Sequence, residues 1–146
     1  MAPVARQLLV DVTTLREKMT DVSLEPAMIA NGAVELLDDV SRTKITGEEE
    51  RYSYIDLVDL RANVDGSKAA FEAVEPMVAA RQPSLASQIG ARVAAVDALL
   101  ATYKSGPGTY DYASYETLRP ADTRAISAAV DALAEPLSQV SRIVVS

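Results

Sequence analysis

Cysteine and histidine are both absent from this sequence, and each absence removes a class of chemistry. Without cysteine the chain has no disulfide, no thiolate nucleophile and no cysteine zinc site. Without histidine it has no Ser-His-Asp or Cys-His catalytic group, no imidazole metal ligand and no histidine pH switch. The composition therefore argues against an enzyme, because the side chains that commonly activate a nucleophile or a water molecule are missing.

Aromatic residues and long apolar runs are also scarce. Aromatics make up 5% of the chain and Phe71 is its one phenylalanine, so we expect a core of alanine, valine, leucine and isoleucine. No stretch approaches the roughly 18 uncharged apolar residues of a membrane-spanning helix. The first residues also lack the apolar segment of a signal peptide. We expect no insertion into a membrane and no signal peptide in this chain.

The remaining composition is that of an acidic globular protein. Hydrophobic residues are 49% and charged residues 24% of 146 residues, which is too apolar for intrinsic disorder. The formal net charge is -7, so the general field repels nucleic acid and anionic lipid surfaces. An acidic surface suits cations or basic partners, and equally suits a charged face that serves solubility.

Helical periodicity runs through the chain, and no segment alternates as a strand does. Prolines fall where helices begin, at Pro3, Pro26 and Pro120, and Thr46 with Glu49 forms a capping-box pattern. The predicted helices cover about 4–20, 25–42, 46–80, 84–104 and 120–143, with a kink or break expected at Pro76 and a bend at Pro136. Short connections favour antiparallel neighbours, so we predict an all-α, up-and-down bundle of four to five helices in one domain, residues 1–146.

A polar stripe distinguishes the third predicted helix. Its members are Glu49, Tyr52, Asp56, Asp59 and Asn63, separated by intervals of three, four, three and four residues. This spacing places them along one side of a helix, where three carboxylates would repel one another and a bound cation would relieve the repulsion. Oxygen donors suit hard cations such as Ca²⁺, Mg²⁺ or iron(III). The alternative is a stripe that faces water or forms ion pairs, with Arg51 or Arg61 neutralising the acids.

Acidic residues on other helices extend this hypothesis. A larger acidic site would draw on the second and last helices. The residues concerned are Glu35, Asp38, Asp39, Asp131 and Glu135. Each of them is also explained as part of a solvated helix face. A tyrosine-rich connector over 109–119, with Tyr110, Tyr112 and Tyr115, is either a lid packed on the end of the bundle or a ligand platform.

Two adjoining runs carry a resemblance to a known family, NGAVELLDDV at 31–40 and KITGEEERYS at 44–53. Further segments later in the chain carry the same resemblance. They are Asp56-Leu57, Asp59-Leu60, ANVDG at 62–66, SYET at 114–117 and ALAEPLS at 132–138. Together these segments resemble the imelysin-like domain of bacterial iron-uptake proteins of the EfeO type, and specifically its second helical bundle. The resemblance covers the chain from about residue 24, and the first helix fits more loosely.

This resemblance implies a helical, metal-associated, extracytoplasmic protein that helps to bring iron into the cell, usually as a lipoprotein or secreted component. The family is also grouped with peptidases because of a His-x-x-Glu motif in the first half of its domain, where two bundles face each other. The present chain resembles only the second bundle and contains no histidine. The resemblance therefore implies a non-catalytic module rather than a peptidase.

The metal site that the resemblance implies is incomplete or altered in this chain. Family members often have histidine after Arg-Tyr-Ser, and this chain has Tyr54. That tyrosine either serves as an oxygen ligand to iron(III) or replaces a lost ligand with packing and hydrogen bonding. The residues that match the family's cleft in kind are Glu49, Arg51, Ser53, Asp56 and Asn63. The candidate metal ligands are Glu49, Tyr52, Tyr54, Asp56, Asp59 and Asn63.

Two functions follow from the sequence. The first is a metal-associated binding module related to iron uptake, with iron or another hard cation held by the polar stripe and no certain cofactor. The second is a structural half-domain that pairs with itself, as a homodimer, or with a first-half partner to form a two-bundle cleft. Neither function involves nucleic acid or catalysis.

Overall fold

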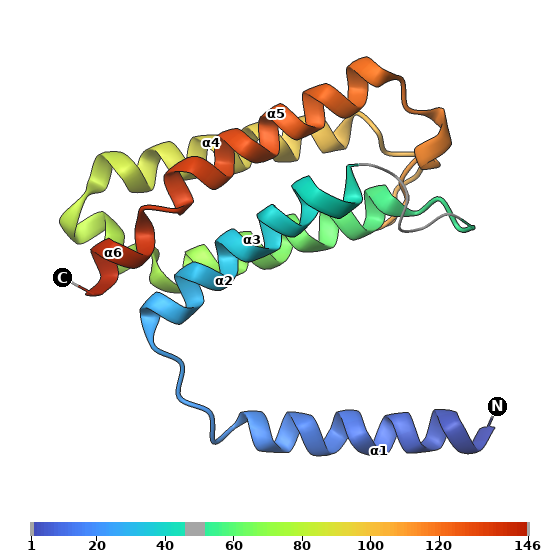
Figure 1. Cartoon of the computed structure of the whole chain (residues 1–146), viewed down its shortest axis with the longest axis horizontal. Coiled ribbons are helices and arrows are strands. Elements are labelled where there is room, and N and C mark those ends of the chain that lie inside the picture. Colours follow the sequence, from blue (N-terminus) through green and yellow to red (C-terminus); the bar gives the residue numbers. More distant parts are fainter. Residues whose placement is uncertain (1, 46–51, 146) are drawn as a thin grey trace.

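The computed structural model describes residues 2–45 and 52–145, and nearly all of this chain is helical (Figure 1). Its elements are α1 (Ala2–Met19), α2 (Pro26–Asp39), a π-helical turn η1 (Val40–Lys44), α3 (Asp56–Arg81), α4 (Pro83–Ala101), a 3₁₀ turn η2 (Tyr115–Thr117), α5 (Pro120–Leu137) and α6 (Val140–Val145). No strand occurs in the described ranges; one isolated β-bridge joins Lys104 and Tyr112. The predicted all-α bundle is confirmed.

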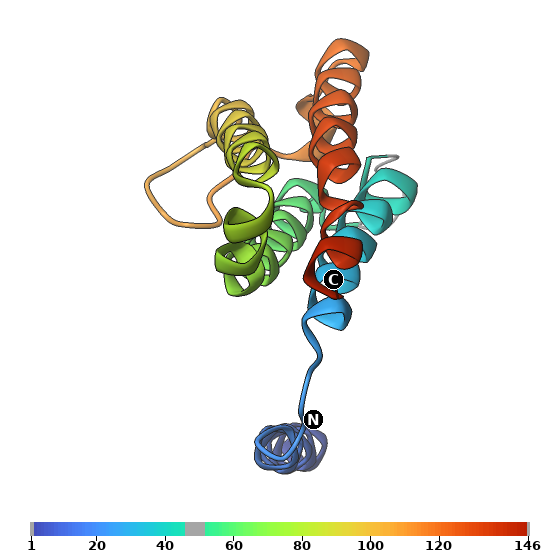
Figure 2. The ribbon, with the colours of Figure 1, turned by 90° about the vertical axis from the view of Figure 1, so that its left-hand side faces the viewer.

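The bundle consists of two helix pairs that cross-pack around one apolar core. Helices α2 and α3 form one pair, α4 and α5 form the other, and α6 turns back against α2 (Figures 1 and 2). Aliphatic side chains fill the interior, as the composition predicts. The largest of those that are almost fully buried are Leu37, Leu57, Leu60, Ile89, Leu100, Ile126, Leu133 and Leu137.

Helix α1 lies outside this bundle. Every side chain of residues 3–19 is exposed, and both views show α1 separated from α2 by an extended connection (Figures 1 and 2). The helix itself was predicted, at 4–20. Its apolar residues, however, take no part in the core.

The two internal prolines differ in their effects. Pro76 lies inside α3, which continues to Arg81, so of the predicted kink or break the break does not occur. The expected bend at Pro136 is instead an interruption, because α5 ends at Leu137 and α6 starts at Val140. A proline removes one helical hydrogen bond, and the surrounding packing decides whether the helix continues.

The start of the third helix also differs from prediction. Residues 52 and 53 form a turn, Tyr54 has a left-handed φ of 57°, and α3 begins only at Asp56. A non-glycine residue in the left-handed conformation cannot be part of a continuous α-helix. The predicted helical conformation of 52–55 is therefore wrong. The predicted capping box, Thr46 with Glu49, lies outside the described residues.

Helix α4 has the length and composition of a membrane-spanning helix, with a mean hydropathy of 1.2. Core helices of ordinary bundles meet the same criterion. Its apolar side packs into the core through Leu85, Ile89, Val96 and Leu100. The hydropathy of α4 is thus explained by the interior of the bundle.

Candidate functional site

Helix α3 presents a core face flanked by two polar edges. The core face includes Leu57, Leu60 and Val64, all fully buried. Residues three and four apart lie next to each other on a helix, so one edge carries Asp56, Asp59 and Asn63 and the opposite edge carries Arg61, Asp65 and Lys68. We call the first the α2 edge and the second the α4 edge, after the helices they approach.

Asp56 is the most deeply buried of the candidate ligands. It is fully buried in the first turn of α3, where the partial positive charge of the helix N-terminus favours a carboxylate. Tyr115 lies near it. Burial raises the pKa of the Tyr115 phenol, and the nearby Asp56 charge raises it further. A charged side chain with no exposed surface is uncommon, so this end of the bundle is a candidate for a functional site.

Tyr115 connects three segments around Asp56. Its hydroxyl donates to the carbonyl of Ile45 after η1, and its backbone N–H donates to the carbonyl of Tyr54 at 3.0 Å. Tyr54 is half-buried and holds the left-handed conformation described above. Tyr112 and Tyr115 pack against the core while Tyr110 is 56% exposed. The connector thus covers the end of the bundle, as the lid alternative requires.

The α2 edge continues from Asp59 to Asn63. The Asn63 amide nitrogen lies 3.5 Å from both the Leu36 carbonyl and Oδ2 of Asp39, so it bridges α3 to α2. Asp59 is half-buried one turn before it. Tyr52 is 95% exposed and precedes the helix. Asp56, Asp59 and Asn63 therefore share the helix as predicted, Tyr52 and Tyr54 do not, and Glu49 lies outside the described residues.

These positions are the part of the predicted cation site that the structure describes. In the described ranges no three acidic side chains lie close enough together to hold a metal ion. Helix α3 offers two carboxylates and one amide oxygen, which are ligand types that hard cations accept. The predicted ligand set stays a prediction, because one of its carboxylates belongs to a residue that the structure does not describe.

The other acidic candidates have local structural roles. Asp131 accepts hydrogen bonds from the hydroxyls of Ser41 at 3.0 Å and Ser127 at 3.5 Å, joining η1 to α5. Glu35 and Asp39 line a surface groove between α2 and α3. Asp38 and Glu135 are exposed.

An ion-pair network on the α4 edge was missed from the sequence. Arg61 is hydrogen-bonded to Asp65 one turn later and, at 2.6 Å, to Asp97 of α4, and its side chain is only 11% exposed. Burial alone would lower the pKa of Arg61, but the two carboxylates raise it well above its usual value. Arg61 thus neutralises Asp65 and Asp97 on this edge. The Arg61–Asp65 spacing is readable in the sequence, whereas Asp97 is brought in by tertiary packing.

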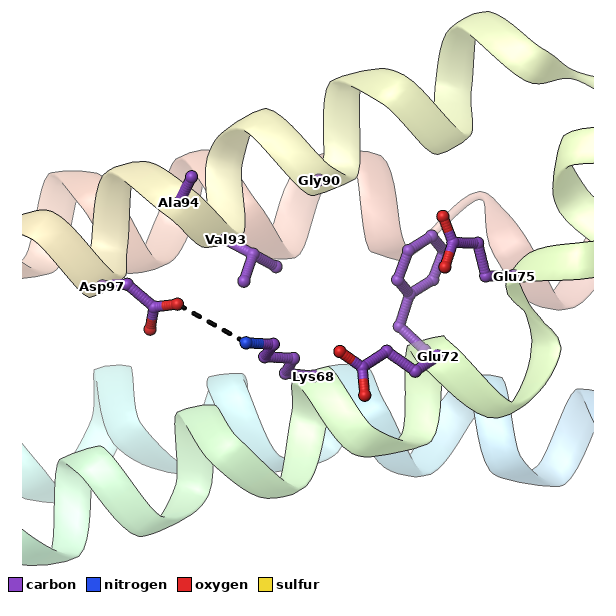
Figure 3. Close-up of a pocket in the computed structure, with 8 residues that line it drawn as sticks. Lys68, Glu72, Glu75, Gly90, Val93, Ala94 and Asp97 are labelled. Atoms are coloured by element: carbon purple, nitrogen blue, oxygen red, sulfur yellow. Dashed lines mark ion pairs between the residues drawn. The ribbon is translucent and has the colours of Figure 1, made fainter. Parts of the chain in front are cut away.

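A groove between α3 and α4 adjoins this network, with a volume of about 250 Å³. Figure 3 shows Lys68 and Asp97 facing each other across it, with a 3.7 Å ion pair. Phe71 and Val93 line it, and the exposed Glu72 lies farther along α3. The carboxylates of Glu72 and Glu75 also line it, but among the described residues no three acidic side chains lie close enough together to hold a metal ion.

Comparison with known proteins identifies the family. The family model described as imelysin matches residues 1–140. The chain belongs to the imelysin family. This result confirms the resemblance and extends it to α1, which the sequence motifs fitted only loosely.

Two relatives of this imelysin-family chain are named for iron uptake. It is 36% identical over 136 residues to "Iron uptake system component EfeM" of Pseudomonas syringae pv. syringae, covering 93% of this chain and 47% of that protein. It is 35% identical over 136 residues to "Iron uptake system component EfeO" of Escherichia coli K12, covering 93% of this chain and 36% of that protein. The chain thus spans less than half the length of these relatives.

Proposed function

We propose that this chain is a non-catalytic module of bacterial iron uptake that contributes the α2 edge of α3 to an iron-binding site. The names of its relatives support the pathway, since both are iron uptake system components. The observation that carries the site is Asp56, a fully buried carboxylate beside Tyr115 in the first turn of α3. By family resemblance we further propose an extracytoplasmic location.

The donor chemistry supports iron or another hard cation as cargo. Asp56, Asp59 and Asn63 offer carboxylate and amide oxygens from one helix, and Glu49 and Tyr54 are the proposed completing ligands. The 95% exposed Tyr52 is the weakest member of the proposed set. A set without nitrogen or sulfur ligands disfavours zinc and copper.

A binding role is supported over hydrolysis by the lack of histidine and cysteine. Hydrolysis at a metal requires an assembled site that lowers the pKa of bound water, together with a group to move its proton. The proposed oxygen donors bind and orient the cation, and the packed connector at Tyr115 limits the access of water. Purified protein should accordingly leave a broad peptide panel uncleaved.

The test is calorimetric titration with iron(III) citrate and, separately, with CaCl₂. We expect saturable binding by the wild-type chain, weakened about tenfold or more by Asp56→Asn or Asp59→Asn, because each change removes a charged oxygen ligand. Glu72→Gln is the matched control: it removes one negative charge from the opposite side of α3 and should leave binding unchanged. Circular dichroism checks that each variant is folded. No binding below about millimolar concentration would refute the proposal for the isolated chain.

A second function, the interaction half-domain, is supported by one observation. Helix α1 belongs to the matched region and yet exposes all its described side chains. Such a helix favours a chain that pairs with itself or with a first-half partner. Light scattering that finds a strict monomer at high concentration, with no co-purifying protein, would exclude this function.

A further inference from the structure

Tyr115 forms hydrogen bonds to two carbonyls that are far apart along the chain. Its hydroxyl donates to the carbonyl of Ile45, which follows η1, and its backbone N–H donates to the carbonyl of Tyr54 at 3.0 Å. An extended chain spans about 30 Å over such a separation, and bringing its two ends together costs chain entropy. Tyr115 holds both carbonyls within the length of one residue.

The segment that carries Tyr115 is itself anchored to the bundle. This connector between α4 and α5 lies at the end of the bundle where α3 starts (Figure 1). Just after α4, the Tyr103 carbonyl accepts from the Ala113 N–H at 2.9 Å, and within η2 the Tyr115 carbonyl accepts from the Leu118 N–H at 3.0 Å. The Tyr115 side chain also packs against the core. Tyr115 is therefore a fixed point to which other segments can be attached.

The start of α3 needs such an attachment, because local capping does not explain it. The N-cap residue, Ile55, makes no side-chain hydrogen bond to the helix. The residue before it, Tyr54, has a φ of 57°, a conformation that is unfavourable for a residue with a Cβ. The bond from the Tyr115 N–H to the Tyr54 carbonyl supports this conformation from outside the helix.

Where α3 starts determines the surroundings of Asp56. In the first turn of a helix the backbone N–H groups have no intrahelical partner, and their partial positive charge favours a carboxylate. If α3 continued back through 52–55, Asp56 would lie in the interior of the helix and lose this advantage. A fully buried carboxylate depends strongly on such support, since burial of a charge without compensation is costly.

We propose that Tyr115 is the positioning residue of the iron site: it holds the carbonyls of Ile45 and Tyr54 and so fixes Asp56 at the start of α3. The inference rests on the proposed function for its effect on iron binding, whereas the hydrogen bonds themselves can be tested in the metal-free protein. Glu49, a proposed ligand, lies between Ile45 and Tyr54 in the sequence. Tyr115 acts through these neighbours and is not itself a proposed ligand.

Amide hydrogen exchange at residue 115 tests the contact in the full-length, metal-free protein. Tyr115→Phe removes the hydroxyl bond to Ile45 and keeps the ring and the backbone N–H. If the two bonds hold one contact closed, exchange at residue 115 should become about threefold to tenfold faster, which is the factor that one hydrogen bond contributes. Unchanged exchange at this amide in Tyr115→Phe would overturn the proposal.

Ser67→Ala is the matched control, because it also removes a bond from a hydroxyl to a carbonyl. The buried Ser67 Oγ donates to the Ala33 carbonyl at 2.8 Å, about three turns beyond Asp56 on α3. Its loss should speed exchange at the buried Val130 of α5, which depends on the stability of the whole bundle. Residue 115 should stay within about twofold of wild type, because local opening at Tyr115 leaves the Ser67 bond intact. Equal acceleration at residue 115 in both variants would assign the Tyr115 contact to general stability and overturn the proposal.

Calorimetric titration with iron(III) citrate tests the consequence for binding. Tyr115→Phe should raise the Kd about threefold to tenfold although no proposed ligand is altered, and Ser67→Ala should change it less than about twofold. If Asp56→Asn weakens binding and Tyr115→Phe does not, the iron site stands and the positioning role of Tyr115 is wrong. If the wild-type chain binds no iron, the proposed function is refuted for the isolated chain, and exchange at residue 115 decides whether Tyr115 holds Tyr54 in place.

Discussion

Arg61 is a charged side chain that joins α3 to α4. It bonds Asp65 and, at 2.6 Å, Asp97, while only 11% of its side chain is exposed. We predict that Arg61→Ala lowers the free energy of unfolding by about 2 kcal/mol, because two carboxylates lose a charged partner. Urea unfolding followed by circular dichroism measures this loss. Arg92→Ala, an exposed change on α4, should stay within about 0.5 kcal/mol of wild type.

The pKa of Asp122 should report the hydrogen bonds that cap the start of α5. Hydrogen bonds from the Arg119 side chain and backbone, both 2.9 Å, lower its pKa from 3.8 to about 2. Because the folded-state pKa is the lower one, this stabilisation is complete above about pH 4 and is lost as the pH falls toward 2. NMR titration of the Asp122 carboxyl should show the low pKa, and Arg119→Ala should raise it. An unchanged pKa in that variant would contradict the assignment.

At the scale of elements, two helical glycines should respond differently to replacement by alanine. A Cβ on Gly90 of α4 would meet no atom within 4 Å, whereas one on Gly66 of α3 would lie 3.0 Å from Cδ1 of Leu36. Gly90→Ala should therefore stabilise the protein by about 0.5–1 kcal/mol through lower backbone entropy in the unfolded state. Gly66→Ala should lose that gain because Leu36 must shift. Thermal midpoints of the two variants compare them, and an equal rise in both would refute this reasoning.

Helix boundaries show where local sequence suffices. The starts near Pro26, Pro83 and Pro120 were predictable because proline favours the first helical turn. The start of α3 was not predictable from local sequence. The helical spacing continues through Tyr54, but the left-handed backbone of Tyr54 excludes that residue from the helix. That conformation accompanies a tertiary contact, the Tyr115 N–H to Tyr54 carbonyl bond. The polar stripe was therefore predicted too long, because its spacing assumed a helix that already included residues 52–55.

For the whole molecule, the sequence predicted the class of fold but not which helices would share a core. The apolar residues of α1 recur at the same helical spacing as those of α2, and periodicity alone does not say which surface covers them. The candidate site divides in the same way. Asp56, Asp59 and Asn63 lie on α3 as their spacing predicts, while the Arg61–Asp97 pair joins residues whose proximity depends on the packing of α4.

Removing residues 1–22 tests the separation of α1 from the bundle. Since no described side chain of α1 is buried, the shortened chain should keep the helical spectrum of the bundle. Its free energy of unfolding should be independent of protein concentration. If the chain pairs with itself through α1, the full chain should instead become more stable as its concentration rises, because pairing stabilises the native state by mass action. The full-length variant Leu8→Asp/Leu15→Asp, which retains the chain length but charges two exposed apolar positions of α1, should behave like the shortened chain. If the shortened chain fails to fold, α1 has a structural role within the monomer that its exposure does not reveal.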